Sequence, residues 1–335
     1  MHHLPCSDYP ALGTSFRSRP IGTIATLARI LRIPGSQLTE AELLGAAERA
    51  SFLYRIAGEI PKPDGSVRVV LDAKFPLKAI HDRIQRNILK TVQFPEYLQG
   101  SIKRRGQGSN ARKHVGGRII ITEDIENFFP ATSARVIFEV WHRFFKFPPN
   151  VAECLTKLTT KDGSLPQGAK TSPLLANLVF WQEEPALELA LRRRGIVYTR
   201  LVDDITCSAS LDLARDEVKW VIAKIRAMVG TLGFRLKQGK ETVVDAGSRM
   251  IATKLVVNVR VALPSQRRSK IRAAVKAFEA STRANGGTVV DKTLNRVSGQ
   301  LSYLTQYHPA EGKALRARLR ATRGEGPPAG PQHSA

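Results

Sequence analysis

The sequence at 198–210 is Y-T-R-L-V-D-D-I-T-C-S-A-S, with Asp203 and Asp204 adjacent at its middle. Aromatic and β-branched residues lie on both sides of the pair, so this stretch predicts a strand, a tight turn and a second strand. Two adjacent carboxylates repel each other and are costly to bury unless a cation neutralises them. At the tip of an apolar hairpin they are typical of ligands for Mg²⁺, which prefers carboxylate oxygens together with substrate phosphates. A solvated turn is the alternative interpretation of this pair by itself.

The charge of the chain indicates a polyanionic partner. Its 335 residues include 52 lysines and arginines against 29 aspartates and glutamates, which gives a net charge of +23. This excess favours nucleic acid, and a membrane surface is the weaker alternative because no lipidation motif or strongly amphipathic basic helix is present. No apolar run approaches the roughly 20 residues of a membrane span, and the first residues lack the regions of a signal peptide. The three cysteines, Cys6, Cys154 and Cys207, have no metal-ligand spacing, which fits a reducing cytoplasm.

The chain begins with an arm and two helices. Residues 1–20 contain three prolines and little pattern, which predicts a loose arm. The apolar spacing at 21–33 and 36–52 predicts two helices that pack together, the second with Ser36 or Thr39 as a cap.

A β-hairpin and another helix follow. Residues 54–72 alternate between apolar and polar around P-K-P-D-G-S, and Asp64-Gly65 predicts the turn of the hairpin. Lys62 and Arg68 fall on opposite arms and could both face one anion, although solvated hairpins carry such residues routinely. Residues 75–92 predict an amphipathic helix.

The middle of the chain combines a basic segment with a strand and a helix. Residues 100–117 are rich in glycine and carry five basic residues and no acid, which predicts a loop that lies against phosphate or in solvent. The apolar run at 118–121 predicts a strand that delivers Asp124 at its end. The sequence at 162–177 predicts a Pro-Gln-Gly turn that leads into a helix reaching about residue 194, with a break at Pro185.

The region after the aspartate pair ends in a basic helical domain. We expect a turn that holds Lys240, together with a helix at 212–232 and short strands at 234–236, 242–244 and 251–261. From 265 to 325 the pattern is helical, with thirteen lysines and arginines against four acids, as is typical of a domain that grips a nucleic-acid backbone. The last ten residues, rich in glycine and proline, predict disorder.

These elements fit one chemistry. Phosphoryl transfer by two metal ions needs carboxylates from separate strands that converge on cations about 3.5–4 Å apart. Asp124, at the end of one strand, and Asp203 and Asp204, at a hairpin tip, could supply them if their strands are neighbours. The order of strands and helices is that of an antiparallel sheet backed by helices. The residues by themselves therefore indicate an α+β fold and a nucleotidyl transferase.

The motifs, taken in order, resemble those of a reverse transcriptase of the bacterial retron-like group. The matching segments are the first finger motif (54–72), the first palm motif T-E-D-I-E-N-F-F-P (122–130), the dNTP-binding motif L-P-Q-G-A-K-T-S-P (165–173), the catalytic box L-V-D-D (201–204), the lysine motif G-F-R-L-K-Q-G-K-E-T (233–242), the primer-grip strands (251–263) and the thumb (265–322).

This resemblance implies a role for each matching residue. Asp124, Asp203 and Asp204 would be catalytic and, with Ile125, would hold two Mg²⁺ ions. The nucleotide-binding set would be Lys62, Arg68, Phe129, Gln167 and Lys240. In it Phe129 is a steric gate against the ribose 2′-hydroxyl, Gln167 lies over the nucleotide, and Lys240 is near the triphosphate and is a candidate acid for pyrophosphate departure.

A further motif points to the retron subgroup. N-A-R-K-H at 110–114 matches the Asn-Ala-x-x-His pattern of retron enzymes, which implies RNA contacts by Asn110, Arg112, Lys113 and His114. A loop histidine that packs on its own turn is the alternative for His114. Two segments depart from the pattern. Ala252-Thr253-Lys254 stands where Val-Thr-Gly is expected, and Leu201 replaces the usual tyrosine of the catalytic box. Both departures concern primer contact and recognition of the cognate RNA rather than the metal site.

The resemblance also implies an architecture and a function. The architecture is a right-hand polymerase with an N-terminal arm and helices (1–53), fingers (54–115), a palm (116–264) with a finger-type insertion near 131–165, a basic helical thumb (265–322) and a disordered tail (323–335). The function is an RNA-directed DNA polymerase that uses dNTPs to copy a structured noncoding RNA into a branched RNA–DNA hybrid (msDNA), with an effector protein, in anti-phage defence. There are two alternatives. One is another defence-associated or group II intron-like reverse transcriptase, and the other is a catalytically silent RNA-binding scaffold.

Overall fold

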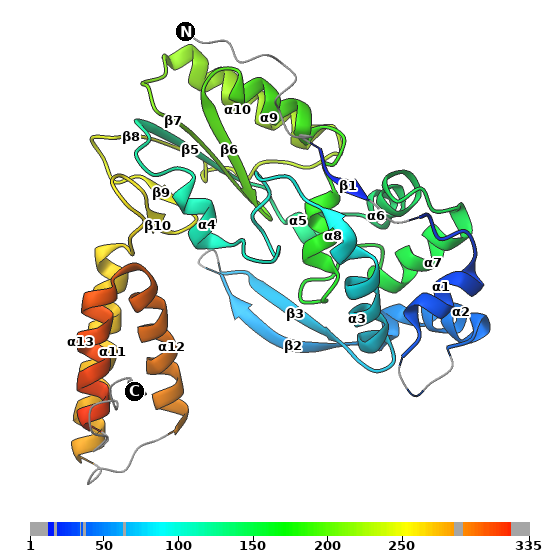
Figure 1. The fold of residues 1–335 in the computed structure, drawn as a ribbon, viewed down its shortest axis with the longest axis horizontal. Helices are drawn as coiled ribbons and strands as arrows, with labels where there is room; N and C mark the ends of the chain where they lie inside the picture. The colour runs from blue at the N-terminus through cyan, green and yellow to red at the C-terminus, as the bar shows by residue number, and fades with distance from the viewer. Residues whose placement is uncertain are drawn as a thin grey trace, which may run out of the picture.

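The computed structural model describes residues 13–16, 19–33, 35, 38–62, 65–284 and 291–322. The predictions for the arm at 1–12 with Cys6, for Ser36, for Asp64 and for the tail at 323–335 fall outside these residues. A broad body of sheet and helices is followed by three C-terminal helices that stand to one side of it (Figure 1). None of the helices in the described part of the chain is long and apolar enough to cross a membrane.

A four-stranded antiparallel sheet lies in the body of the molecule. Its strands are β5 (Ile119–Asp124), β6 (Ile196–Leu201), β7 (Asp204–Ala209) and β8 (Thr242–Asp245), in the order β6-β7-β5-β8. Helices α9 (Glu184–Arg192) and α10 (Arg215–Gly230) lie beside this sheet (Figure 1). Ile121, Tyr198 and Ile205 are buried in the main core. The predicted antiparallel sheet with helices is confirmed, as is the strand, turn and strand predicted at 198–210.

The N-terminal half adds a second hairpin that forms a sheet of its own. Its strands are β2 (Tyr54–Pro61) and β3 (Val67–Ala73), which confirms the hairpin predicted at 54–72. The helices that pack near its base are α1 (Ile24–Leu31), α2 (Glu40–Glu48), α3 (Leu77–Asn87) and α7 (Pro149–Thr159). Thr39 caps α2 through reciprocal hydrogen bonds with Glu42. The short elements here are β1 (Ser15–Phe16) paired with β4 (Val92–Gln93), and two 3₁₀ turns at Ala50–Leu53 and Leu89–Thr91.

Two sequence expectations are corrected by the structure. The segment at 100–117 is not only a loop, because it contains helix α4 (Gln107–Arg112), which packs on β6 and buries Ala111. The long helix expected after Pro-Gln-Gly is two helices, α8 (Ser172–Leu178) and α9. Pro185 lies in the first turn of α9 rather than at the break, since proline is tolerated there without losing a helical hydrogen bond.

The three C-terminal helices are α11 (Ser265–Ala284), α12 (Asp291–Tyr307) and α13 (Pro309–Thr322). They share a second apolar core with the small hairpin β9 (Ile251–Ala252) and β10 (Leu255–Val256), which is what the strand predicted at 251–261 becomes. This hairpin joins the four-stranded sheet to the helices in sequence and in space (Figure 1). The remaining elements are α5 (Phe128–Ala131), α6 (Ala134–Glu139) and a π-helix (Val140–Phe144).

Candidate active site

The three predicted catalytic aspartates come together at one end of the four-stranded sheet. In the register of β5 and β7, Asp124 is directly opposite Asp204. The amide of Ile125 donates a hydrogen bond to the carbonyl of Asp203 at 3.0 Å. Asp124 and Asp204, 80 positions apart in sequence, are therefore neighbours at one end of the sheet, because the strands that carry them are paired.

The turn between β6 and β7 has an unusual backbone. Val202, a β-branched residue, has φ +63°, a conformation that such residues rarely adopt. Gly100 packs against it so closely that a Cβ on Gly100 would lie 2.5 Å from Val202 Cγ2. The absence of a side chain at residue 100 thus leaves room for the turn that presents the aspartate pair.

The electrostatics of the cluster favour the uptake of a cation. Asp203 and Asp204 are half-buried, and burial raises the pKa of both carboxyls, that of Asp204 to about 6. The neighbouring carboxylates add to the shift, since each disfavours a second negative charge. Asp124 accepts a hydrogen bond from Lys240 Nζ at 3.0 Å, and this contact raises the pKa of Lys240.

The donor chemistry fits a hard divalent cation, although the side chains are not preassembled around one. Among the described residues, no three His, Cys, Asp or Glu side chains are close enough together to hold a metal ion as they stand. Asp124 is paired with the Lys240 ammonium, so a positive charge already sits beside the cluster. The groups that converge are carboxylate oxygens, which are hard donors that suit Mg²⁺ rather than a soft metal. The side chain of Ile125 is a hydrocarbon with no donor atom, so only its main-chain carbonyl could contribute.

The β2–β3 hairpin and the Pro-Gln-Gly loop meet beside this cluster. The amide of Leu71 in β3 donates to the carbonyl of Gln167 at 2.7 Å. Gly168, at φ +105°, lies under β3, and a Cβ there would be 2.3 Å from the Leu71 carbonyl oxygen. Arg68, on the same strand, is exposed, and its charge acts on Asp203.

Phe129 and Lys62, the other two residues predicted to bind the nucleotide, lie on two different elements. Phe129 is half-buried in α5, with its ring centroid 6.2 Å from that of Phe128. Lys62 follows β2 and closes the hairpin through main-chain hydrogen bonds with Gly65 and Ser66.

The structure corrects the prediction of RNA contact for Asn110 and His114. Both side chains are buried, at 0% and 1% exposure, so neither presents a surface to RNA. His114 is hydrogen-bonded to Ser208 Oγ at 2.8 Å and to Thr199 Oγ1 at 2.7 Å, and burial lowers its pKa to about 3. His114 therefore connects the end of α4 to both strands of the β6–β7 hairpin. Helix α4 directs Asn110 and His114 toward the core, which the sequence did not predict.

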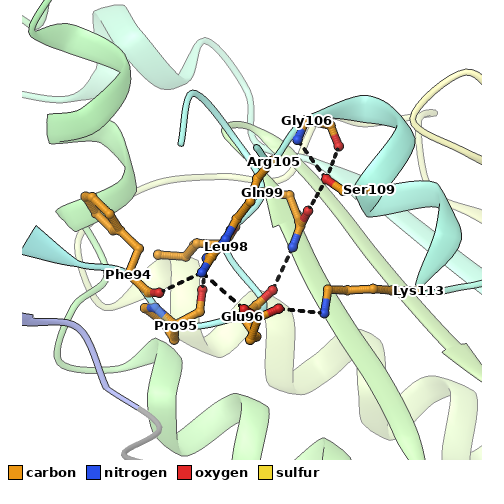
Figure 2. A network of polar contacts seen from close by, with 9 residues as sticks. All are labelled: Phe94, Pro95, Glu96, Leu98, Gln99, Arg105, Gly106, Ser109 and Lys113. Carbon is orange, nitrogen blue, oxygen red and sulfur yellow. Dashed lines mark hydrogen bonds and ion pairs between the residues drawn. The ribbon is translucent and has the colours of Figure 1, made fainter. Parts of the chain in front are cut away.

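Arg112 and Lys113 are exposed on the other side of α4 and border a basic hollow of about 420 Å³. The hollow rests on a network of polar contacts that Figure 2 shows. In it Arg105 donates to the carbonyls of the 94–98 loop, and Lys113 pairs with Glu96 at 3.1 Å. The remaining cations around the hollow, Lys103, Arg104 and Arg112, are exposed.

A buried ion pair that the sequence analysis missed supports the catalytic turn. Arg200, fully buried in β6, donates to both carboxylate oxygens of Glu184, at 2.6 and 2.7 Å. It also donates to the carbonyl of Val202 at 3.0 Å and to that of Asn177 at 3.1 Å. The sequence did contain a signal for this pair, because Arg200 lies two residues after Tyr198 and therefore on the same inward face of the strand. The hydroxyl of Tyr198 also donates to Glu184.

Comparison with known proteins gives one consistent family. Residues 60–276 match the family model described as reverse transcriptase (RNA-dependent DNA polymerase). The chain is 29% identical to the retron Se72 reverse transcriptase of Salmonella heidelberg over 314 residues, which covers 91% of this chain and 80% of that protein. It is 27% identical to the retron Ec48 reverse transcriptase of Escherichia coli, covering 90% and 76% of the two chains. It is 30% identical to the retron Ec86 reverse transcriptase of Escherichia coli, covering 68% and 70%.

Proposed function

The chain belongs to the reverse transcriptase family and, within it, to the bacterial retron reverse transcriptases, and from this premise we propose what it copies and with which residues. It is an RNA-directed DNA polymerase. We propose that it uses dNTPs to copy part of a structured noncoding RNA, starting from a 2′-hydroxyl of that RNA. The product is a branched RNA–DNA hybrid, which acts together with an effector protein in defence against phage.

The meeting of Asp124, Asp203 and Asp204 at one sheet edge carries this proposal. These carboxylates, with the carbonyl of Ile125, are the groups that would hold two Mg²⁺ ions. The ions would lower the pKa of the attacking hydroxyl and stabilise charge at the phosphate. The aspartates are half-buried and repel one another, which is the electrostatic condition under which a hard cation binds.

The nucleotide is held by residues that surround the cluster. Arg68 and Lys62 of the fingers hairpin and Lys240 beside Asp124 provide the positive charge for a triphosphate, and Lys240 is a proton donor for the departing pyrophosphate. Gln167 lies over the nucleotide, and Phe129 excludes a ribose 2′-hydroxyl. Replacing Phe129 with Ala is expected to raise the use of rNTPs relative to dNTPs, and unchanged selectivity would remove the gate from this proposal.

The RNA is held by two basic surfaces, one beside α4 and one on the three C-terminal helices. The exposed cations are Lys103, Arg104 and Arg112 around the hollow beside α4, together with those of the three C-terminal helices. In this proposal the fingers are residues 54–115, the palm is 116–264 with its insertion near 131–165, and the thumb is 265–322. RNA affinity is expected to fall by about 0.9 log units per log unit of salt for each duplex phosphate contact.

The decisive experiment measures incorporation of dNTPs on the cognate RNA. The Asp203→Asn/Asp204→Asn variant should lose incorporation by at least about a thousandfold, because the groups that hold the metal ions are removed. Asp216→Asn, whose side chain is 94% exposed on α10, is the matched control and should behave as the wild type. Removal of Mg²⁺ with a chelator should abolish the activity of the wild type. Equal incorporation by wild type and the double variant would refute the proposed site.

A further inference from the structure

A cavity of about 750 Å³ opens between the catalytic turn and the thumb. Asp204 and Leu201 line it on the palm side, and Lys254 of the β9–β10 hairpin lines it beside them. Arg267 and Lys270 of α11 line the opposite side. One predicted metal ligand thus shares a cavity with three cationic side chains, which is a surface for a polyanionic strand.

Gln107, at the start of α4, forms part of the wall of this cavity and uses both ends of its side-chain amide. Its Nε2 donates to the carbonyl of Thr253, which fixes the orientation of the amide because a carbonyl can only accept. Its Oε1 accepts a hydrogen bond from the hydroxyl of Tyr303 in α12 at 2.8 Å. The Thr253 hydroxyl donates in return to the Gln107 carbonyl at 3.3 Å. One glutamine therefore connects α4, the β9–β10 turn and the thumb.

The turn between β9 and β10, which Gln107 contacts, has a sequence that does not favour its backbone conformation. Thr253 and Lys254 are the two central residues between β9 and β10, with φ +45° and +69°. Such two-residue turns favour glycine and asparagine, and a β-branched residue at positive φ is uncommon and costly. A contact from outside the hairpin is therefore needed to keep the turn in this form, and the two hydrogen bonds between Gln107 and Thr253 provide it.

We propose that Gln107 is a positioning residue, which locks the Thr253–Lys254 turn to the thumb so that Lys254 faces a phosphodiester of the strand being extended beside Asp204. This inference rests on the proposed polymerase function. It assigns Gln107 and Tyr303 to retention of that strand rather than to the chemical step, since neither side chain reaches the aspartates through any hydrogen bond among the described residues.

The test compares Gln107→Met, Tyr303→Phe and the double variant with the wild type on a primed RNA template. A competitor trap limits each enzyme to one binding event, and both the product length and the addition of the first nucleotide are measured. Tyr303→Phe removes one hydrogen bond and should dissociate about two- to tenfold faster, and Gln107→Met removes two and should dissociate at least as fast. Both should make shorter products. The KM for the dNTP and the rate of first addition should be unchanged. The double variant should match the stronger single variant, because both substitutions break the same connection.

Tyr307→Phe is the matched control, because it removes a hydroxyl from the next turn of α12 that lies against Gly108 instead. It should give products of wild-type length. If Gln107→Met fails to fold, Tyr303→Phe decides the question by itself, since the ring that packs in the thumb is retained. Wild-type product lengths from Tyr303→Phe, or effects of the two substitutions that multiply, would overturn the inference alone. A wild type that incorporates no dNTP would overturn the proposed function, and this inference with it.

Discussion

The molecule contains two hairpins that serve one site but are built in opposite ways. The β6–β7 hairpin lies within the four-stranded sheet, and most of its side chains are buried. The β2–β3 hairpin forms a sheet of its own, and its outer residues are exposed, with Ile56 at 61% and Val67 at 50% exposure. The first carries the paired aspartates, and the second carries the cations Lys62 and Arg68.

The difference follows from what each hairpin has to do in the proposed reaction. Carboxylates that share metal ions must keep their positions within a fraction of an ångström, so their turn is fixed from several sides, by Arg200, His114 and Gly100. A hairpin that receives and releases a nucleotide needs only a firm base, and β3 has one at Leu71, over Gly168. The buried β6–β7 hairpin is therefore held rigidly, whereas the exposed β2–β3 hairpin is free to move above its base.

The largest effect is expected from Arg200→Met. This change leaves Glu184 charged and buried without its partner and removes the hydrogen bond to the Val202 carbonyl. The free energy of unfolding should fall by about 3–5 kcal/mol, measured by urea denaturation. The double variant Arg200→Met/Glu184→Met should recover most of this loss but not the polymerase activity, because the turn stays unsupported. A single variant within about 1 kcal/mol of wild type would contradict the importance of the network.

Gly168→Ala should detach the fingers hairpin at its base. The new Cβ would meet the Leu71 carbonyl oxygen at 2.3 Å, at a backbone φ of +105° that alanine rarely adopts. We expect a loss of about 2–3 kcal/mol in stability, a raised KM for dNTPs and faster proteolysis within β2–β3. Gly58→Ala is the control in the same hairpin, because a Cβ there meets nothing within 4 Å. Equal behaviour of the two variants would show that the base is not a fixed point.

The catalytic hairpin should be sensitive to acid through His114. Burial lowers the pKa of this histidine to about 3, whereas in the unfolded chain it takes up a proton near pH 6.5. The unfolded state thus binds more protons between these values, so stability falls as the pH drops below about 6.5, by up to about 1.4 kcal/mol per pH unit.

Urea denaturation of His114→Gln between about pH 7 and pH 5 measures this contribution. Glutamine does not titrate, so the acid-dependent loss should be shallower than in the wild type. It should not vanish, because burial also lowers the pKa of His81 and His308. Identical slopes for the two proteins would mean that His114 takes up its proton without unfolding the hairpin.

The smallest effect is expected on the outer face of the fingers hairpin. Val69→Thr keeps the shape of a side chain that is 39% exposed, so stability should change by less than about 0.5 kcal/mol. Ile205→Thr, at a position 1% exposed in β7, should cost about 2 kcal/mol or more in the same measurement. Similar costs at the two positions would remove the contrast between the hairpins.

Local sequence was sufficient where neighbouring residues determine the structure. The β-formers on both sides of Asp203 and Asp204 predicted the β6–β7 hairpin, and Thr39 was one of two predicted caps for a helix and does cap α2. Prediction failed at 100–117, where glycines and basic residues concealed α4. The buried side of that helix contacts β6 and the β9–β10 hairpin, which are 85 residues or more away in sequence, so no local pattern could reveal it.

The sequence by itself determined the types of groups available for catalysis: three carboxylates after β-forming runs, a lysine in a later turn, and an excess of basic residues. Only the tertiary structure decided which of them meet. The pairing of β5 with β7 placed Asp124 opposite Asp204, and the packing of α4 turned His114 into the core while leaving Arg112 outside. The physical reason is that strand register and burial are set by contacts between distant segments, whose free energy is gained only when the whole core forms.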